Sequence, residues 1–205
     1  MIAAGLAIGA YAVFARLSVA SEQQRLVAEY REGEQAETAV PSGPSESAGP
    51  AVSTLPDPDA AQPAEGEDTS PATLAVLSIP SIDLEVAVRE GVGSWSLRYS
   101  VGHYTPSVMP GETGNCVIMG HRNYTYGEFF NRLNEVEAGD ALVLERKGVA
   151  YTYVVTETYV VEPDDTSVLD PSGDAVLTLI TCTPIRVATH RLIVRAVLQT
   201  EQAAG

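Results

Sequence analysis

The chain contains little positive charge and few cysteines. Its 205 residues include 12 Lys and Arg against 27 Asp and Glu, for a formal net charge of -15. No basic stripe is visible, which argues against a nucleic-acid partner bound through its phosphates. The two cysteines are too few for a disulfide framework. Cys116 and Cys182 could still pair in an oxidising compartment, although two cysteines rarely meet the geometry that a disulfide needs.

Long apolar runs are also scarce, apart from residues 2–20, where Arg16 interrupts a nearly apolar sequence. A helix that spans a bilayer needs about 20 such residues, so this run is just long enough for a membrane anchor. A buried helix and a signal peptide cleaved after Ser18-Val19-Ala20 are the alternatives, but no basic residues precede the run. On its apolar length we favour an uncleaved anchor over residues 1–31, with residues 21–31 as a polar helical continuation.

Residues 32–71 lack Lys and Arg and have almost no large apolar side chains, whereas Pro, Ser, Ala, Gly and acidic residues are abundant. Such a segment cannot bury enough apolar surface to offset the entropy that it would lose on ordering. Its acidic residues also repel one another and extend the chain. We therefore predict a disordered stalk that holds the following domain away from the membrane.

The remaining residues, 72–205, have the pattern of short strands separated by Gly- and Pro-containing turns. Apolar residues at helical spacing predict one short helix over residues 128–136, and residues 94–99 are expected to form a turn or short helix. Many short strands in about 130 residues indicate an all-β domain built as a closed or nearly closed barrel. The predicted strands are residues 73–80, 84–91, 115–121, 140–146, 150–162, 175–181 and 191–198.

Three reactive side chains stand at the ends of these predicted strands. Cys182 and His121 each follow an apolar run, and Arg191 begins the last strand. A thiol, an imidazole and a guanidinium are the parts of a cysteine nucleophile, its acid–base partner and an anion stabiliser. The competing interpretation is a buried structural thiol, because free cysteine is among the most buried residue types. That interpretation suits Cys116, which we expect to be a small apolar strand residue.

The motif Thr178-Leu179-Ile180-Thr181-Cys182 resembles that of the sortases, cysteine transpeptidases that attach proteins to Gram-positive cell walls or join pilin subunits. Arg191 follows nine positions later, and Gly120-His121-Arg122 lies upstream, in the family's order. The resemblance covers roughly residues 74–198. It also includes Leu77-Ser78-Ile79-Pro80-Ser81-Ile82, Val101-Gly102-His103-Tyr104 and Pro110-Gly111-Glu112-Thr113-Gly114-Asn115.

The resemblance implies an eight-stranded barrel outside the cell, attached to the membrane by a single N-terminal helix. It implies that Cys182 is the nucleophile, that His121 transfers protons and that Arg191 stabilises the oxyanion, with no cofactor. The substrates would be surface proteins with an LPxTG-like sorting signal, joined to an amine of a peptidoglycan precursor or of a pilin subunit. The short segment 162–174 and the absence of a second apolar run after Leu198 favour class D, with classes E and A as alternatives.

Three residues are expected to bind the substrate. Thr181, just before the nucleophile, would contact the substrate or the oxyanion through its hydroxyl or its backbone. Val168 and Leu169 would line a pocket for the leucine of the signal. The acidic residues around them lack the spaced ligand pattern of a calcium site, so the sequence predicts a solvated loop and no metal.

The other histidines and arginines are assigned structural roles. His103 is expected in the core or in a hydrogen-bonding role. His190 should face away from the site, since neighbouring residues of a strand point to opposite faces. Arg195 shares the face of Arg191 but lies deeper in an apolar run, and Arg186 is expected in a solvated loop.

Two other classes of function remain open. A different cell-wall cysteine acyl-transferase or protease, such as an L,D-transpeptidase, also pairs cysteine with histidine, but its Ser-His-Gly-Cys pattern is missing here. A non-enzymatic extracellular β-barrel that binds a ligand would carry Cys182 incidentally. Loss of function in a Cys182→Ala variant would favour an enzyme, and retention would favour the binding module.

Overall fold

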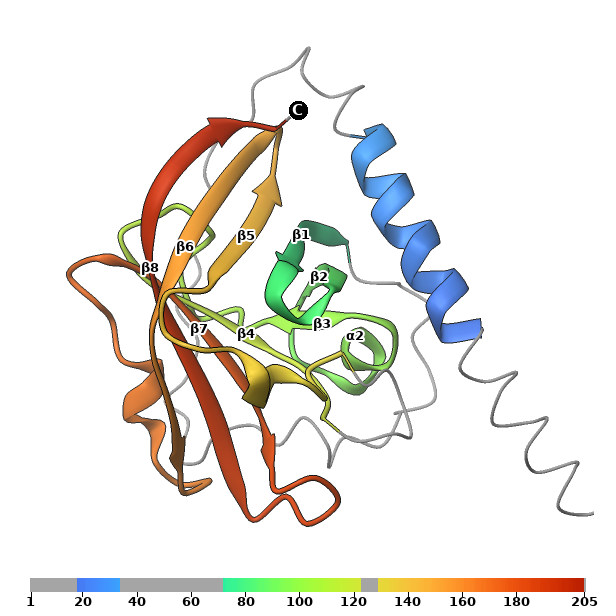
Figure 1. The fold of residues 1–205 in the computed structure, drawn as a ribbon. Helices are drawn as coiled ribbons and strands as arrows, with labels where there is room; N and C mark the ends of the chain where they lie inside the picture. The colour runs from blue at the N-terminus through green and yellow to red at the C-terminus, as the bar shows by residue number, and fades with distance from the viewer. Residues whose placement is uncertain (1–17, 34–71, 123–128, 205) are drawn as a thin grey trace, which may run out of the picture.

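The computed structural model describes residues 18–33, 72–122 and 129–204 (Figure 1). After a helix over residues 18–33, strands make up most of the described chain. The elements that follow are β1 (Thr73–Ile79), η1 (Pro80–Ile82), β2 (Leu84–Glu90), α2 (Ser94–Tyr99), β3 (Val101–His103), β4 (Gly114–Met119), η2 (Leu133–Glu135), β5 (Ala141–Arg146), β6 (Val149–Val161), η3 (Thr166–Leu169), β7 (Ala175–Thr183) and β8 (His190–Ala203).

The strands form one closed barrel in the order β1-β2-β3-β4-β7-β8-β6-β5, and β5 pairs with β1 to complete it. Two neighbouring pairs are parallel, β2 with β3 and β4 with β7, and the other pairs are antiparallel. Closure leaves no unpaired edge. The predicted all-β, eight-stranded barrel with short helices is confirmed.

Two details of the predicted elements are wrong. β3 is missing from the predicted strands, because a strand of three residues is too short to show an alternating pattern. Over its described residues, 129–136, the helix predicted for residues 128–136 is instead a run of turns with the 3₁₀ turn η2. Phe130, Leu133 and Val136 are all buried, and their spacing of three suits 3₁₀ geometry as well as an α-helix.

The barrel wall between β4, β7 and β8 is apolar on both faces. Residues of one parity, such as Ile118, Leu179 and Val194, fill the barrel interior. Residues of the other parity form a second buried cluster on the outer face, together with Val168 of η3. We call this set the outer cluster: Val117, Met119, Val168, Ile180 and Ile193. The outer cluster is covered in part by η3, so this face of the wall is a packed surface rather than a solvated one.

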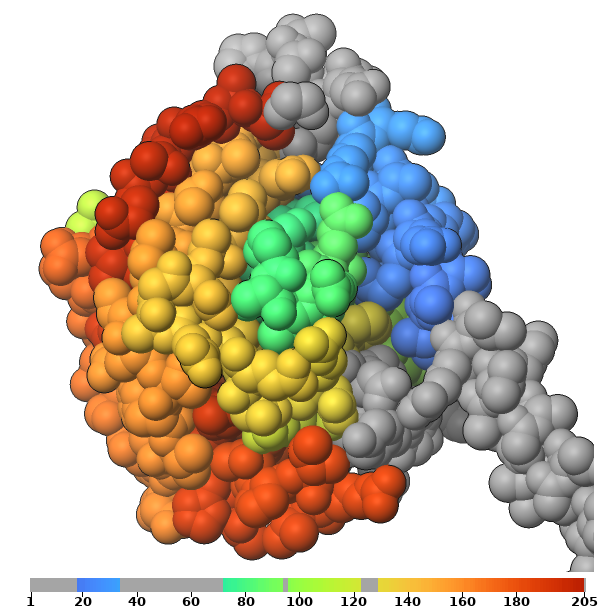
Figure 2. Space-filling view, in the orientation of Figure 1, coloured from blue at the N-terminus to red at the C-terminus, as the bar shows by residue number. Residues whose placement is uncertain are grey.

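The helix over residues 18–33 lies against the outside of β1 and β2 (Figures 1 and 2). Leu26 and Val27 are buried against Val76 and Ala87 of these strands. The Gln23 side chain is also buried. Its Oε1 accepts from the Ala87 N–H at 2.9 Å, and its Nε2 donates to the Tyr99 carbonyl.

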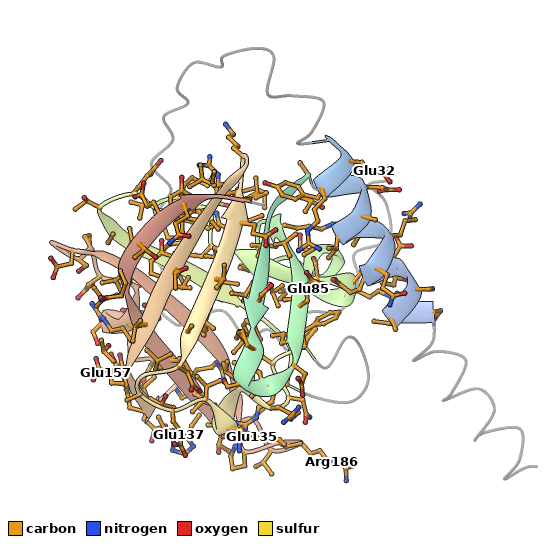
Figure 3. All side chains as sticks on the ribbon, turned by 45° about the horizontal axis from the view of Figure 1, so that its top comes forward. Glu32, Glu85, Glu135, Glu137, Glu157 and Arg186 are labelled. Atoms are coloured by element: carbon orange, nitrogen blue, oxygen red, sulfur yellow. The ribbon has the colours of Figure 1, made fainter. Side chains whose placement is uncertain are left out.

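The C-terminal part of the same helix contacts the start of the barrel. The Tyr30 hydroxyl donates to the Leu74 carbonyl at 3.0 Å. Arg31 forms ion pairs with Glu85 of β2, at 2.5 Å, and Glu145 of β5, at 3.2 Å. Glu85 is labelled beside the helix in Figure 3. Residues 21–31 are therefore helical as expected, but they are docked on the barrel.

The end of the docked helix lies beside the start of β1. Because Tyr30 contacts Leu74, the chain leaves the helix and enters β1 at one place on the barrel. The intervening residues 34–71 lie outside the described residues. The prediction that residues 32–71 form a disordered stalk that holds the domain away from the membrane therefore stays a prediction.

The predicted membrane anchor falls mostly on residues 1–17, which are outside the described part of the chain. Within the described ranges, none of the helices combines the length and the apolar character that crossing a bilayer requires.

The docking contacts can be tested with two neighbouring glutamines. Gln23→Ala leaves the Ala87 N–H and the Tyr99 carbonyl without their partner, which should lower the free energy of unfolding by about 1–3 kcal/mol. Gln24→Ala, on the exposed side of the same helix, should change it by less than about 0.5 kcal/mol. Urea unfolding of the full chain measures both; equal midpoints for the two variants would mean that the helix is not docked in solution.

Candidate active site

Cys182 and Arg191 lie opposite each other on two antiparallel strands. They are Cα partners in the pairing of β7 with β8. Side chains directly opposite each other point to the same face, with Cβ atoms about 4.5–5.5 Å apart. The thiol and the guanidinium therefore leave the barrel wall side by side.

His121 reaches the same level through the parallel pairing of β4 with β7. The last Cα partners of that pairing are Met119 and Ile180, and the Gly120 N–H then donates to the Ile180 carbonyl at 3.1 Å. Continuing the register by two residues sets His121 level with Cys182. In the sequence, these three side chains stand at separate strand ends. The order of the strands in the sheet brings them into one row.

The row lies on the outer face of the wall, directly beyond the outer cluster. Ile180 and Ile193 of that cluster are two residues away from Cys182 and Arg191 along their strands. The three side chains of the row are nearly enclosed, with exposed fractions of 1% for Cys182, 4% for His121 and 3% for Arg191. Charges in such surroundings interact more strongly than they do in water.

Backbone contacts hold Arg191 in place. One guanidinium nitrogen, Nη1, donates to the carbonyls of Ala188, at 3.3 Å, and His190, at 3.2 Å. Both carbonyls belong to the end of the β7–β8 connection, so the cation is fixed against the loop that follows the nucleophile. Arg186, in the same connection, is exposed, as expected, and projects away from the barrel (Figure 3).

Arg122 is a further buried cation. It was noted in the sequence only as part of the motif Gly120-His121-Arg122. Its exposed fraction is 6%. Its Nη1 donates to the Cys182 carbonyl at 3.4 Å, and its Nη2 donates to Asn134 Oδ1 at 2.8 Å. The residue after His121 thus reaches the backbone of the nucleophile. No periodicity or spacing signals such a contact; only the position directly after His121 does.

Thr181 has its side chain on the other face of β7 from Cys182. Being adjacent to Cys182 on a strand, it points to the opposite face, and it is fully buried. Its Oγ1 donates to the Gly120 carbonyl at 2.8 Å. The hydroxyl thus has a partner within the barrel wall, and a contact of Thr181 with the substrate or the oxyanion, through its hydroxyl or its backbone, stays a prediction.

Val168 and Leu169 lie on the same outer face as the row. Both belong to η3, Val168 as a buried member of the outer cluster and Leu169 as a partly buried residue packed against it. They are thus close to the strands that carry Cys182 and His121, and their role in binding a leucine stays a prediction.

The remaining histidines have structural partners, as expected. His103 is buried, and its Nε2 lies 3.1 Å from both the Val108 carbonyl and Ser107 Oγ. His190 forms an ion-pair contact with Glu162 at 3.1 Å. It pairs with Thr183 in the sheet and so faces away from Arg191.

Cys116 also has the structural role that was expected. It is a free, fully buried thiol inside the barrel. Burial raises its pKa to about 12. Cys182 is not part of a disulfide either, and the two cysteines lie on opposite faces of the wall. Among the residues that the structure describes, no group of three or more His, Cys, Asp or Glu side chains could hold a metal ion.

Comparisons with known proteins agree on one family. The family model for the sortase domain matches residues 77–199. Sortase D of Bacillus subtilis (strain 168) is 32% identical over 126 residues, which are 62% of this chain and 59% of that protein. The match thus leaves about two fifths of the Bacillus protein uncovered. It agrees with a class D-like assignment.

Solved structures lead to the same family. A lid mutant of sortase A from Corynebacterium diphtheriae is 33% identical, with a TM-score of 0.62 over 65% of this chain and 73% of its own. Sortase E1 from Streptomyces coelicolor, solved with a tripeptide in the active site, is 33% identical, with a TM-score of 0.59 over 64% of this chain and 90% of its own. Fold, row of side chains and family model coincide over the same residues, and the chain belongs to the sortase family.

Proposed function

We propose that this protein is a cysteine transpeptidase that cleaves a sorting signal and transfers the acyl part to an amine. The observation that carries the proposal is the row of Cys182, His121 and Arg191 at one level of three neighbouring strands. A nucleophile, a proton carrier and an anion stabiliser must all reach one carbonyl group. Side chains at neighbouring strand ends are close enough to do so.

In the first half of the reaction, the Cys182 thiolate attacks the carbonyl carbon of the threonine in an LPxTG-like signal. The carbonyl oxygen becomes an oxyanion, which the Arg191 guanidinium stabilises; one well-aimed donor contributes about 3–4 kcal/mol in such a step. His121 protonates the leaving amine as the C–N bond breaks. The products are a thioester on Cys182 and a free C-terminal fragment.

The second half reverses these roles. An amine enters, gives its proton to His121 and attacks the thioester carbonyl, again with Arg191 at the oxyanion. The C–S bond breaks, an amide forms, and the thiolate of Cys182 is restored beside a protonated His121. No redox change occurs in either half, so the cycle needs no cofactor. The amine would belong to a peptidoglycan precursor or a pilin subunit.

The site of action follows from the same proposal. Surface proteins with sorting signals are available on the outer side of the cell membrane, and residues 2–20 would act as a single-pass anchor. The helix over residues 18–33 would then place the barrel next to that anchor, because it is bound to β1 and β2. Val168 and Leu169 would receive the apolar residue of the signal. Class D is the favoured subclass.

The full chain should form a covalent adduct with the peptide. Incubation with a panel of LPxTG-like peptides should give a thioester on Cys182 in mass spectrometry, and addition of an amine should release the joined product. Cys182→Ala should abolish both products, since the acyl group then has no acceptor. His121→Ala and Arg191→Ala should each lower the rate by at least about 100-fold.

A folded protein with a free Cys182 that forms no adduct with any peptide would contradict the proposal. A non-enzymatic binding module would then be the better account, and a function that survives Cys182→Ala would support it.

The close packing around Gly120 should matter for His121. A Cβ at Gly120 would lie 2.7 Å from the ring of Phe130 and 2.9 Å from Val101, so Gly120→Ala must shift the chain just before His121. We expect a loss of about 1–3 kcal/mol in the free energy of unfolding and a slower acylation step. Gly173→Ala is the matched control, because nothing lies within 4 Å of its Cβ position. Similar acylation rates for the two variants would contradict this.

The two cysteines should differ in reactivity. At about pH 8 the Cys116 thiol stays protonated, because its pKa is raised to about 12, and only thiolates are alkylated at a useful rate. Iodoacetamide should therefore label Cys182 at least about tenfold faster than Cys116 in the native protein. Peptide mapping of the labelled chain gives both rates, and unfolding in urea should make them equal. Faster labelling of Cys116 would overturn the assignment.

A further inference from the structure

A buried polar pair stands within the otherwise apolar outer face of the wall. Asn115 of β4 is 3% exposed and Thr178 of β7 is fully buried. Both have the parity of the row: Asn115 shares a face with His121, and Thr178 shares a face with Cys182. The Thr178 hydroxyl donates to Asn115 Oδ1 at 2.7 Å. Neither residue has a part in the reaction proposed above.

The nitrogen of the Asn115 amide binds the η3 turn. Its Nδ2 donates to the Val168 carbonyl at 2.9 Å and to the Asp170 carbonyl at 3.1 Å. An amide nitrogen has two protons, and both are used here. Because both partners are carbonyls while the Oδ1 partner is a hydroxyl, only one orientation of the amide satisfies all three contacts. Thr178 therefore fixes the amide, and the amide fixes the turn.

The turn also has side-chain contacts of its own at its beginning. Asp165 Oδ1 accepts from the Ser167 N–H at 3.1 Å and from the Ser167 hydroxyl at 2.6 Å. These contacts stay within the turn and do not connect it to the barrel. Asn115 supplies the polar connection to the wall, and Val168 adds an apolar one within the outer cluster.

The level of the turn suits a peptide that starts at Cys182. An extended peptide rises about 3.3 Å per residue, so the leucine of a Leu-Pro-x-Thr segment would lie about 10 Å from the carbonyl under attack. Along β7 that distance falls between Ile180 and Thr178, which are two and four residues before Cys182. Leu169, at the edge of the outer cluster, lies on this part of the face.

We propose that Asn115 and Thr178 are positioning residues that hold the η3 turn in place and thereby form the pocket for the apolar residue of the sorting signal. The inference rests on the proposed function for the identity of the peptide, but not for the role of the pair in ordering the turn. Without the pair, the turn keeps its own Asp165–Ser167 contacts and loses its polar connection to β4.

The test compares the full chain with its Asn115→Ala and Thr178→Val variants. Hydrogen exchange of the amides over residues 163–171 should become about tenfold faster in Asn115→Ala, and less so in Thr178→Val, which leaves the amide in place. The matched control is Ser100→Ala, which removes another fully buried hydroxyl, bonded to the Ser96 carbonyl at the end of α2. Exchange over residues 163–171 should be unchanged in this control.

Peptide kinetics provide the second readout. In both variants of the pair, KM for the peptide should rise, by about tenfold in Asn115→Ala, while kcat stays within about twofold. The rate of Cys182 alkylation should not change, because the row itself is left intact. A general loss of stability would lower kcat and alkylation as well, which distinguishes a positioning role from a structural one.

Unchanged exchange over residues 163–171 in both variants would overturn the proposal, and so would faster exchange with an unchanged KM. If Asn115→Ala does not fold, Thr178→Val decides by the same measurements. If the wild-type chain transfers no peptide at all, the proposed function fails, and the exchange data alone then decide whether the pair orders the turn.

Discussion

The candidate site depends on the parallel pairing of β4 with β7. Two parallel neighbouring strands have their carboxyl ends at the same edge of the sheet. Side chains at these two ends therefore lie near each other. β4 ends just before His121, and β7 ends at Thr183, just after Cys182, with the register continuous from Gly114 to Met119. In an antiparallel arrangement the same two sequences would leave the imidazole and the thiol at opposite ends of the barrel.

Three short contacts keep the two strand ends in register beyond the ladder. The Gly120 N–H donates to the Ile180 carbonyl, the Thr181 hydroxyl donates to the Gly120 carbonyl, and Arg122 donates to the Cys182 carbonyl. Each contact joins a residue next to His121 with a residue at or within two positions of Cys182. A displacement of about 1 Å between reacting groups is enough to reduce catalysis strongly, so these neighbours matter as much as the row itself.

The sequence was sufficient to predict what depends on local pattern. The alternation along residues 175–181 and 191–198 determined which side chains share a face, and it separated Arg191 from His190 correctly. It could not predict contacts whose partners are distant along the chain. Nothing near Thr181 indicates that its hydroxyl is used by Gly120, and nothing near Asn115 indicates that its amide holds a turn more than fifty residues away.

The docked helix illustrates the same limit at a larger scale. As a sequence, residues 21–31 show charges and only a few apolar side chains, which favours a solvated continuation of an anchor. Leu26 and Val27 become meaningful only against Val76 and Ala87, whose side chains point out of the barrel rather than into it. From the sequence, those two strand residues could equally be core residues, because each lies in a continuous apolar run, residues 74–77 in β1 and 86–88 in β2.

This packing also changes how the acidic composition should be interpreted. Residues 32–71, the predicted stalk, carry part of the net charge of -15. Since the helix before this segment and β1 after it meet at Tyr30 and Leu74, its length does not determine the distance from the helix to the site. That distance is determined by the packing of the helix on β1 and β2.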